Sequence, residues 1–347
     1  MLFSSQLLRL EPAARLLAIA IVSSQFWTHY AIAQTSSNCN PTESTSCPAD
    51  TALGKSVSIN FASGSSSQFT ASGSPTYNSS GACFTVAKSG DAPLLTSNWY
   101  IMFGQVSVVM KAAPGAGIVS SSVLLSDDLD EIDWEFIGAQ DNQVQTNYFG
   151  KGVSTTSGRG ATLAATGTQD EFHTYTVVWT STQLVWQVDG VTVRTLLASD
   201  ANGQYPQTPM RVRLGAWSGG DPSNPPGTIA WADGPTDYAD GPFTMIVKSV
   251  SVQDYSTGTS YSYSDTSGDW TSIKAAGGSV NGGSVSGSSV SGGSVSGSSA
   301  SVAAAVAATT TTEATNAATT YSGLPSGWTV NSSGRIIAPS NAAPLGK

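Results

Sequence analysis

Histidine is almost absent from this chain, with two residues in 347. A serine or cysteine nucleophile usually needs a histidine base, and zinc sites are commonly built from His and reduced Cys. Both classes of enzyme are therefore disfavoured, and we expect neither a metal nor a cofactor. His173 shares its alternating strand face with Tyr175 and Val177, so we interpret it as structural.

Charge is also scarce, because only 11% of residues are Asp, Glu, Lys or Arg, and the net charge is -9. This negative net charge repels the phosphates of nucleic acids and the head groups of anionic lipids. The strongest apolar run, Leu16 to Val22, is far shorter than the roughly 20 residues of a membrane-spanning helix. We expect a monomer that acts on a neutral, polar substrate, with no nucleic acid partner and no membrane span.

The N-terminal segment has the order of a secretory signal. Arg9 and Arg15 precede the apolar run, and Ala31-Ile32-Ala33 follows it. Small residues at that point suit cleavage after Ala33. We therefore assign residues 1–33 to a signal peptide and expect a protein secreted to the extracellular space or cell wall.

Only three cysteines are present, and after export they would lie in an oxidising compartment. The short-range pairing Cys39 to Cys47 is the natural disulfide, although a bridge from Cys83 to either partner stays open. Strand-like neighbours favour Cys83 as a buried thiol. The N-glycosylation pattern occurs at Asn78 and Asn331.

From Ser56 to about Gln253 the chain shows short β-branched and aromatic runs broken by Gly, Pro, Asn and Asp, without a helical period. The Asp189-Gly190 pair is typical of a type I′ hairpin. These features predict an all-β protein, a jelly-roll β-sandwich of two antiparallel sheets with a concave substrate groove. The predicted strands are 56–61, 83–87, 100–110, 118–125, 131–137, 143–149, 174–180, 184–188, 192–196, 211–217 and 244–252.

Composition changes abruptly after Trp270, where Gly- and Ser-rich units recur at 282–289 and 292–299. A threonine run at 309–312 follows, and such segments cannot pack a core. We therefore predict one catalytic domain over residues 34–272 and a Ser/Gly/Thr-rich low-complexity tail over 273–347.

The densest chemical signal is a run of six acids in nine residues between Asp127 and Glu135. Strand alternation sends Glu131, Asp133 and Glu135 to one face. It sends the apolar Ile132, Trp134 and Phe136 to the other, where they can enter a core. The pattern predicts a strand that carries three carboxyl groups into a groove.

Three crowded acids repel one another when ionised, so at least one is expected to be protonated, as a general acid must be. Retaining glycosidases hold their two carboxyl groups about 5 to 5.5 Å apart and inverting ones about 6.5 to 9.5 Å. Two glutamates four residues apart on a strand can lean to the shorter separation. A calcium site and a solvated acidic face are the alternatives, but the alternation with bulky apolar residues disfavours both.

The segment Asp130-Glu131-Ile132-Asp133-Trp134-Glu135 resembles the catalytic strand of glycoside hydrolase family 16, in its shorter, unbulged form. More narrowly, the chain is similar to the Crh-type transglycosylases of fungal cell walls, which join chitin to β-glucan. The resemblance extends from the Cys39–Cys47 segment through 147–152, 172–175 and the tryptophans to Tyr255.

The resemblance implies that Glu131 is the nucleophile, that Glu135 is the acid/base, and that Asp133 assists the nucleophile. It also implies chitin and β-glucan as partners. Crh-type proteins often end in a hydrophobic segment for a glycolipid anchor. No such signal is visible here, because Ile336-Ile337 is followed by Ala338-Pro339.

Sugar rings stack on aromatic side chains, so Tyr148, Trp217 and Trp231, each near a turn, are candidate substrate platforms. Trp179 and Trp186 lie inside predicted strands and are expected in the core. Two functions remain as alternatives to a transglycosylase. One is a hydrolytic endo-β-glucanase of the same fold, and the other is a noncatalytic, lectin-like wall protein.

Overall fold

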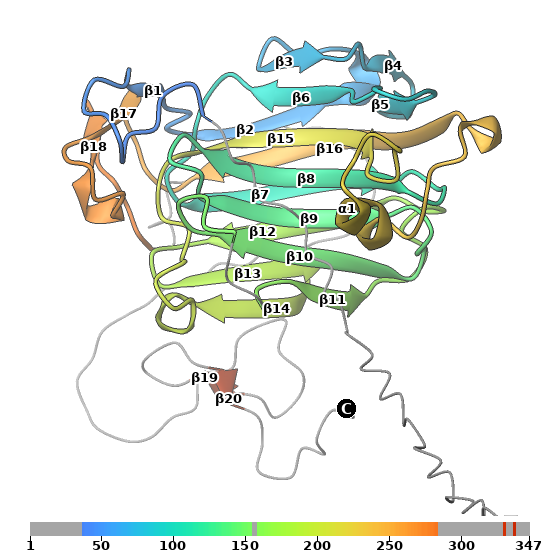
Figure 1. Ribbon diagram of the computed structural model, residues 1–347. Coiled ribbons are helices and arrows are strands. Elements are labelled where there is room, and N and C mark those ends of the chain that lie inside the picture. The colour runs from blue at the N-terminus through green and yellow to red at the C-terminus, as the bar shows by residue number, and fades with distance from the viewer. Residues whose placement is uncertain (1–36, 155–157, 284–328, 331–335, 338–347) are drawn as a thin grey trace, which may run out of the picture.

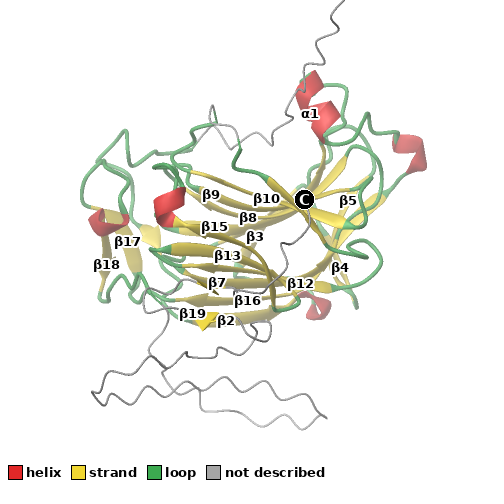
Figure 2. Ribbon diagram, turned by 90° about the horizontal axis from the view of Figure 1, so that it is seen from below, coloured by secondary structure: helices red, strands yellow, loops and turns green. Residues whose placement is uncertain are grey.

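The computed structural model describes residues 37–154 and 158–283, together with residues 329–330 and 336–337. The predicted signal peptide, Asn331 and most of the predicted tail lie outside these residues. The ribbon forms two large antiparallel sheets stacked face to face (Figures 1 and 2). The predicted all-β sandwich is confirmed.

The first sheet has seven strands in the order β11-β10-β9-β8-β15-β6-β3. Its middle strands β8, β9 and β10 follow one another along the chain, whereas β15 joins from much later in the sequence. The bounds of the seven strands are β3 Phe69–Ser72, β6 Leu94–Ser97, β8 Ile118–Ser126, β9 Glu131–Ile137, β10 Gln143–Phe149, β11 Ala161–Ala164 and β15 Met210–Ser218.

The second sheet has the order β14-β13-β12-β7-β16-β5-β4, and β2 pairs with β16 outside this path. Both residues of the predicted Asp189-Gly190 turn between β13 and β14 have positive φ, at 50° and 79°, as the hairpin requires. The strand bounds are β2 Ser56–Asn60, β4 Thr76–Asn78, β5 Gly81–Val86, β7 Gly104–Lys111, β12 His173–Trp179, β13 Gln183–Val188, β14 Val191–Leu197 and β16 Phe243–Asp254.

Smaller elements lie at the two ends of the sandwich (Figure 1). A three-stranded sheet, β1 (Asp50–Thr51), β17 (Ser260–Tyr263) and β18 (Ile273–Ala276), lies at one end, and the helix α1 (Pro226–Trp231) lies toward the other. Four 3-10 turns and a short hairpin complete the described elements: Phe61–Ser63, Ala198–Asp200, Tyr238–Asp240, Trp270–Ser272, β19 (Thr329–Val330) and β20 (Ile336–Ile337).

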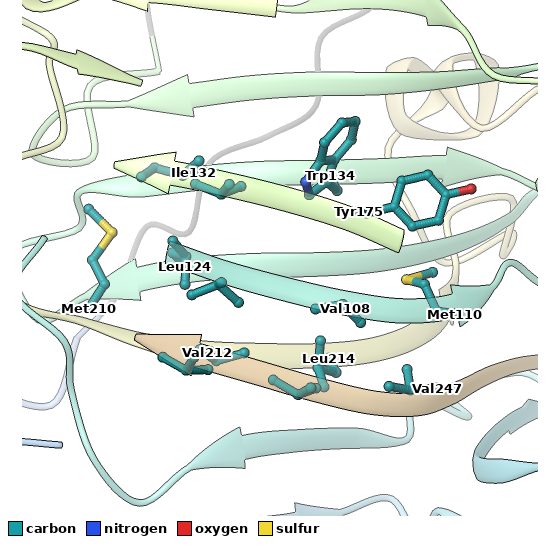
Figure 3. Close-up of a cluster of buried hydrophobic side chains, with 14 of the residues drawn as sticks. Val108, Met110, Leu124, Ile132, Trp134, Tyr175, Met210, Val212, Leu214 and Val247 are labelled. Carbon is teal, nitrogen blue, oxygen red and sulfur yellow. The ribbon is translucent and has the colours of Figure 1, made fainter. Parts of the chain in front are cut away.

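The core fills the space between the two sheets, and both contribute to it (Figure 3). Trp134 of β9 contacts Tyr175 of β12 edge to face, with ring centroids 5.5 Å apart. Trp179 and Trp186 are fully buried, so their predicted place in the core is confirmed. The Trp186 indole donates a 3.1 Å hydrogen bond to the Asp133 carbonyl, which ties the second sheet to the acidic strand.

The cysteine prediction is confirmed, since Cys39 and Cys47 form a disulfide and Cys83 is a buried free thiol. The predicted domain boundary at residue 272 was too early. Ile273 is 4% exposed, β18 pairs with β17, and the Gly282 carbonyl accepts hydrogen bonds from Ser181. The sequence of this segment shows no strand pattern of its own. Its strand β18 forms by pairing with β17, in which Tyr263 lies opposite Ile273.

Candidate active site

The three acids of β9 lie on one face of the seven-stranded sheet. β9 pairs in unbroken register with β8 on one side and β10 on the other, so its alternation is regular from Glu131 to Ile137. Ile132, Trp134 and Phe136 are each 1% exposed within the core. Glu131 and Glu135 instead line a cavity of about 260 Å³ on the outer face of the sheet.

Neighbouring strands supply the rest of this catalytic cavity. The register runs Arg213, Val123, Asp133 and Asn147 in one row across β15, β8, β9 and β10. A parallel row places Ser121 and Gln145 on either side of Glu135. Residues two apart on one strand have their side chains on the same face of the sheet. The residues of both rows therefore have their side chains on the same face as the three acids.

Asp133 is 2% exposed, and its carboxyl group lies close enough to that of Glu131 for the two to interact. No donor among the described residues bonds to either Asp133 oxygen. Burial, followed by the charges of Glu131 and Glu135, raises the pKa of Asp133 well above its usual range.

Glu135 is the second acid with a raised pKa. Burial and the charge of Glu131 raise its pKa to about 8, and its buried Oε2 has no hydrogen-bond partner among the described residues. A carboxyl that keeps its proton at neutral pH and faces a cavity can donate it to a bound molecule.

Two arginines complete the charge pattern around Glu131. Arg159 and Arg213 both interact electrostatically with it, and Arg159 also attracts Asp133. The Arg159 guanidinium lies over the Phe149 ring, 4.4 Å from the centroid, and Phe149 is directly opposite Glu131 in the register. Sequence analysis missed both arginines, because Arg213 reaches the acids through the pairing of β15 with β8, and Arg159 lies in the connection between β10 and β11, where no strand pattern places it.

The other acids of the dense run have a different role. Asp128 and Asp130 are fully buried, and the Thr208 hydroxyl, which has one proton to donate, lies within hydrogen-bond distance of a carboxyl oxygen of each. Asp130 also accepts from the backbone of Lys151 and Gln207. This network fixes the β8–β9 turn immediately before Glu131.

The aromatic candidates divide into two groups. Trp217 lines the catalytic cavity, and Trp231 of α1 stacks on it with ring centroids 6.1 Å apart. Tyr148 was wrongly predicted to be a groove platform. It lies directly opposite Ile132, is 5% exposed, and belongs to the core beneath Arg194. Strand alternation places it on the face away from the acids.

His173 does not contribute to this cavity. His173, at the start of β12 in the other sheet, pairs through Nδ1 with Asp189 at 2.7 Å.

Within the described ranges, no group of three or more His, Cys, Asp and Glu is placed to hold a metal ion. No helix of the described part is long and apolar enough to cross a membrane.

Residues 63–233 match glycosyl hydrolases family 16. The solved structure of an Apo Crh5 transglycosylase is 52% identical, with a TM-score of 0.66, and the match covers 68% of this chain and 99% of that one. The chain belongs to glycoside hydrolase family 16. The Crh5 transglycosylase solved in complex with NAG matches this family 16 chain equally well, at 52% identity over the same shares and with a TM-score of 0.67.

Curated fungal relatives of this family 16 chain are longer than the part that matches. Crh-like protein 4 of Botryotinia fuckeliana is 63% identical over 250 residues, which are 72% of this chain and 66% of that protein. Crh-like protein 4 of Aspergillus fumigatus is 60% identical over 250 residues, which are 72% of this chain and 55% of that protein. The chain thus spans less than two thirds of these relatives' length.

Proposed function

We propose that this protein is a retaining transglycosylase of the cell wall, which cleaves chitin-type β-1,4 chains and transfers the glycosyl group to a β-glucan or chitin acceptor. The observation that carries the proposal is the pairing of Glu131 and Glu135, which project from β9 into one cavity with the buried Asp133 between them along the strand. This pairing lies in a domain 52% identical to a transglycosylase.

In the first half-reaction, Glu135 donates its proton to the glycosidic oxygen and Glu131 attacks the anomeric carbon. The bond from that carbon to the leaving oxygen breaks as the bond to Glu131 forms, which gives a glycosyl ester and a shortened chain. Asp133 acts as a positioning residue, because it lies between Glu131 and Glu135 on the same face of β9 and does not itself line the cavity.

In the second half-reaction, the ionised Glu135 takes a proton from an acceptor hydroxyl. That oxygen attacks the anomeric carbon and the ester to Glu131 breaks, so both carboxyl groups return to their starting states. Water at about 55 M competes for this step, and a sugar prevails only if it is oriented beside Glu135. We assign that orientation to Trp217, backed by Trp231.

The substrate and location follow from similarity and from the sequence. A Crh5 transglycosylase has been solved with NAG, the sugar unit of chitin, which favours a chitin-type donor. Residues 1–33 are assigned as a cleaved signal peptide, and the mature protein as a secreted monomer of the wall. Asn78 is proposed to be glycosylated, because it is exposed on the β4–β5 hairpin; Asn331 is the second proposed site.

The test is product analysis with a chitin oligosaccharide donor and a labelled β-glucan oligosaccharide acceptor. We expect a labelled hybrid chain with little new reducing sugar, and no product from the Glu131→Gln variant. Predominantly shortened chains at high acceptor concentration would establish the hydrolytic endo-β-glucanase instead. Binding without any product would favour the lectin-like protein.

A further inference from the structure

Arg194 lies on β14, the end strand of the second sheet, but its guanidinium group binds the first sheet (Figure 1). It pairs in register with the buried Trp186 of β13, so both side chains are on the inner face of their sheet. The Arg194 guanidinium carbon lies 4.6 Å from the centroid of the Trp186 ring. No step of the proposed reaction uses this arginine.

The two outer nitrogens of the Arg194 guanidinium bind two segments of the first sheet. Nη1 donates to the carbonyl and the hydroxyl oxygen of Thr146 on β10, at 2.9 and 2.8 Å. Nη2 donates to the carbonyl of Arg159, in the connection between β10 and β11. The donors of a guanidinium form a rigid planar fork, so they fix their two partners relative to each other. Arg194 therefore holds the backbone of Arg159 in place beside β10.

The side chain of Arg159 lies beside Glu131. Its guanidinium lies over the Phe149 ring, 4.4 Å from the centroid, and donates to the Val153 carbonyl at 2.6 Å and to Gln204 at 3.3 Å. Phe149 and Glu131 are directly opposite each other on β10 and β9, so their side chains are neighbours on the acid face of the sheet. The position of Arg159 thus brings a positive charge to the nucleophile.

The negative charge of Glu131 needs this neighbour. Glu131 must be ionised to attack, but Asp133 and Glu135 face it from the same strand and repel it when they ionise. The residues directly opposite Glu131 on β8 and β10 are uncharged. Arg159 from the β10–β11 connection and Arg213 from β15 offset the repulsion.

We propose that Arg194 is a positioning residue: through Thr146 and the Arg159 backbone, it holds the Arg159 guanidinium beside Glu131, where the positive charge favours the ionised nucleophile. The proposal rests on the proposed function, because Glu131 is the nucleophile only in that reaction. Arg194 acts through the position of Arg159 and not through its own charge. An end strand of the second sheet thereby contributes to the chemistry of the first.

NMR titration of the glutamate carboxyl groups tests this without any substrate. The full-length protein is labelled with carbon-13 at the glutamate carboxyl carbon, and the Glu131→Gln variant identifies the Glu131 signal. The titration midpoint of that signal is then compared among variants. Few signals have to be resolved, because the chain contains only six glutamates: Glu11, Glu43, Glu131, Glu135, Glu171 and Glu313.

Loss of the Arg159 charge should have the largest effect. Arg159→Met should raise the Glu131 midpoint by about one pH unit or more, because a positive charge close to a carboxyl group lowers its pKa by about 1 to 3 units. Arg194→Lys should raise the midpoint by a smaller amount although the charge stays, because one ammonium group cannot bind Thr146 and the Arg159 carbonyl together. The double variant should match Arg159→Met alone, since the two residues act as one unit.

The matched control is Arg211→Lys. The Arg211 guanidinium also lies over an aromatic ring, 4.5 Å from the centroid of Tyr100, but β10, β9 and β8 separate its strand β15 from β11. This variant should leave the Glu131 midpoint unchanged. An unchanged midpoint in Arg194→Lys, additive shifts in the double variant, or an equal shift in Arg211→Lys would overturn the proposal.

Thr146→Val decides the question if Arg194→Lys does not fold, which its melting temperature reports. The substitution removes one acceptor of Arg194 and leaves the charge and the side-chain volume almost unchanged. The Glu131 midpoint should again move upward, by less than in Arg194→Lys. A folded Thr146→Val protein with the midpoint of the unmodified protein would contradict the proposal.

The pH dependence of activity provides a separate comparison. In Arg194→Lys the acid limb of kcat/KM should move upward with the Glu131 midpoint, whereas the alkaline limb, which reports Glu135, should stay in place. A purely structural loss would lower activity without moving either limb. If the unmodified protein neither cleaves nor transfers, the proposed function fails, while the NMR midpoints still decide whether Arg194 positions Arg159.

Discussion

The Trp231 indole donates a 2.9 Å hydrogen bond to Oε1 of Gln145, the residue directly opposite Glu135 on the neighbouring strand. Helix α1 therefore connects through one side chain to the neighbour of Glu135, the proposed acid/base. We predict that Trp231→Phe lowers transfer several-fold, because the bond to Gln145 is lost and the stack on Trp217 is weakened by part of the roughly 0.5 to 1.5 kcal/mol typical of aromatic pairs.

The matched control for that substitution is Trp99→Phe. Trp99 donates an equivalent 2.9 Å bond to Gln68, but it does not line the catalytic cavity. Both variants should lose about 1 kcal/mol of stability. Equal transfer rates in the two would show that the α1 connection has no catalytic role.

A second prediction concerns the acids themselves. Glu131→Gln and Glu135→Gln should each lower turnover by at least about 100-fold, because an amide of the same shape can neither attack nor carry the proton. Asp133→Asn should lose less activity, since it acts on Glu131 and not on the sugar. Initial rates on chitin oligosaccharides measure this, and a folded Glu131→Gln protein with normal turnover would refute the assignment.

The pH dependence of activity provides a third prediction. The raised pKa of Glu135, about 8, means that its proton is present below this pH and lost above it. Cleavage needs that proton, so kcat/KM should decline as the pH rises through about 8. A pH–rate profile with an alkaline limb near pH 6 or below would contradict Glu135 as the general acid.

Stability should follow pH in the same direction. Burial raises the pKa of four acids to about 7 or 8, so the folded chain binds more protons than the unfolded chain between about pH 4 and 8, and its stability falls as the pH rises across that range. The four are Asp50, Asp130, Glu135 and Asp254. The melting temperature should be higher at pH 5 than at pH 8 by several degrees, and Glu135→Gln should reduce the difference.

The end of the folded domain provides a fifth prediction, from two truncations. A chain ending at 283 keeps β18, whereas one ending at 272 loses it together with the buried Ile273. Burial of an Ile side chain contributes about 1.5 to 3 kcal/mol, so the shorter chain should melt roughly 3 to 12 °C lower. Equal melting temperatures would mean that β18 adds nothing to stability.

The sequence predicted the bounds of β9 and β10 correctly. Acidic and apolar residues alternate along β9 from Glu131 to Phe136, whereas β10 was predicted from its apolar and aromatic residues. The short edge strands β3, β4 and β11 were not predicted; they have exposed, polar residues whose pairing supplies the only signal. The helix α1 was also missed, because six residues starting at a proline are too few to show a helical period.

For the active site, the sequence could predict the residues that share one strand but not those that join from other strands. Glu131, Asp133 and Glu135 are adjacent on β9, so alternation alone groups them. Arg213 reaches them only through its pairing on β15 with Val123 of β8, which lies 90 residues earlier in the chain, and no local sequence pattern indicates that pairing. The Tyr148 prediction was wrong for a different reason: alternation along β10 already groups Tyr148 with the apolar Val144 on the core face, and this local signal was not used.

The chain order of the seven-stranded sheet has an evolutionary consequence. The acids and their immediate neighbours belong to one contiguous meander, β8-β9-β10-β11, whereas the walls beside them come from distant segments, including β6 and β15. Insertions and substitutions in those distant segments can alter which polymer fits without altering the spacing of the acids. Chemistry and selectivity are thus encoded in separate stretches of the gene, so that paralogues can diverge in substrate while they inherit one mechanism.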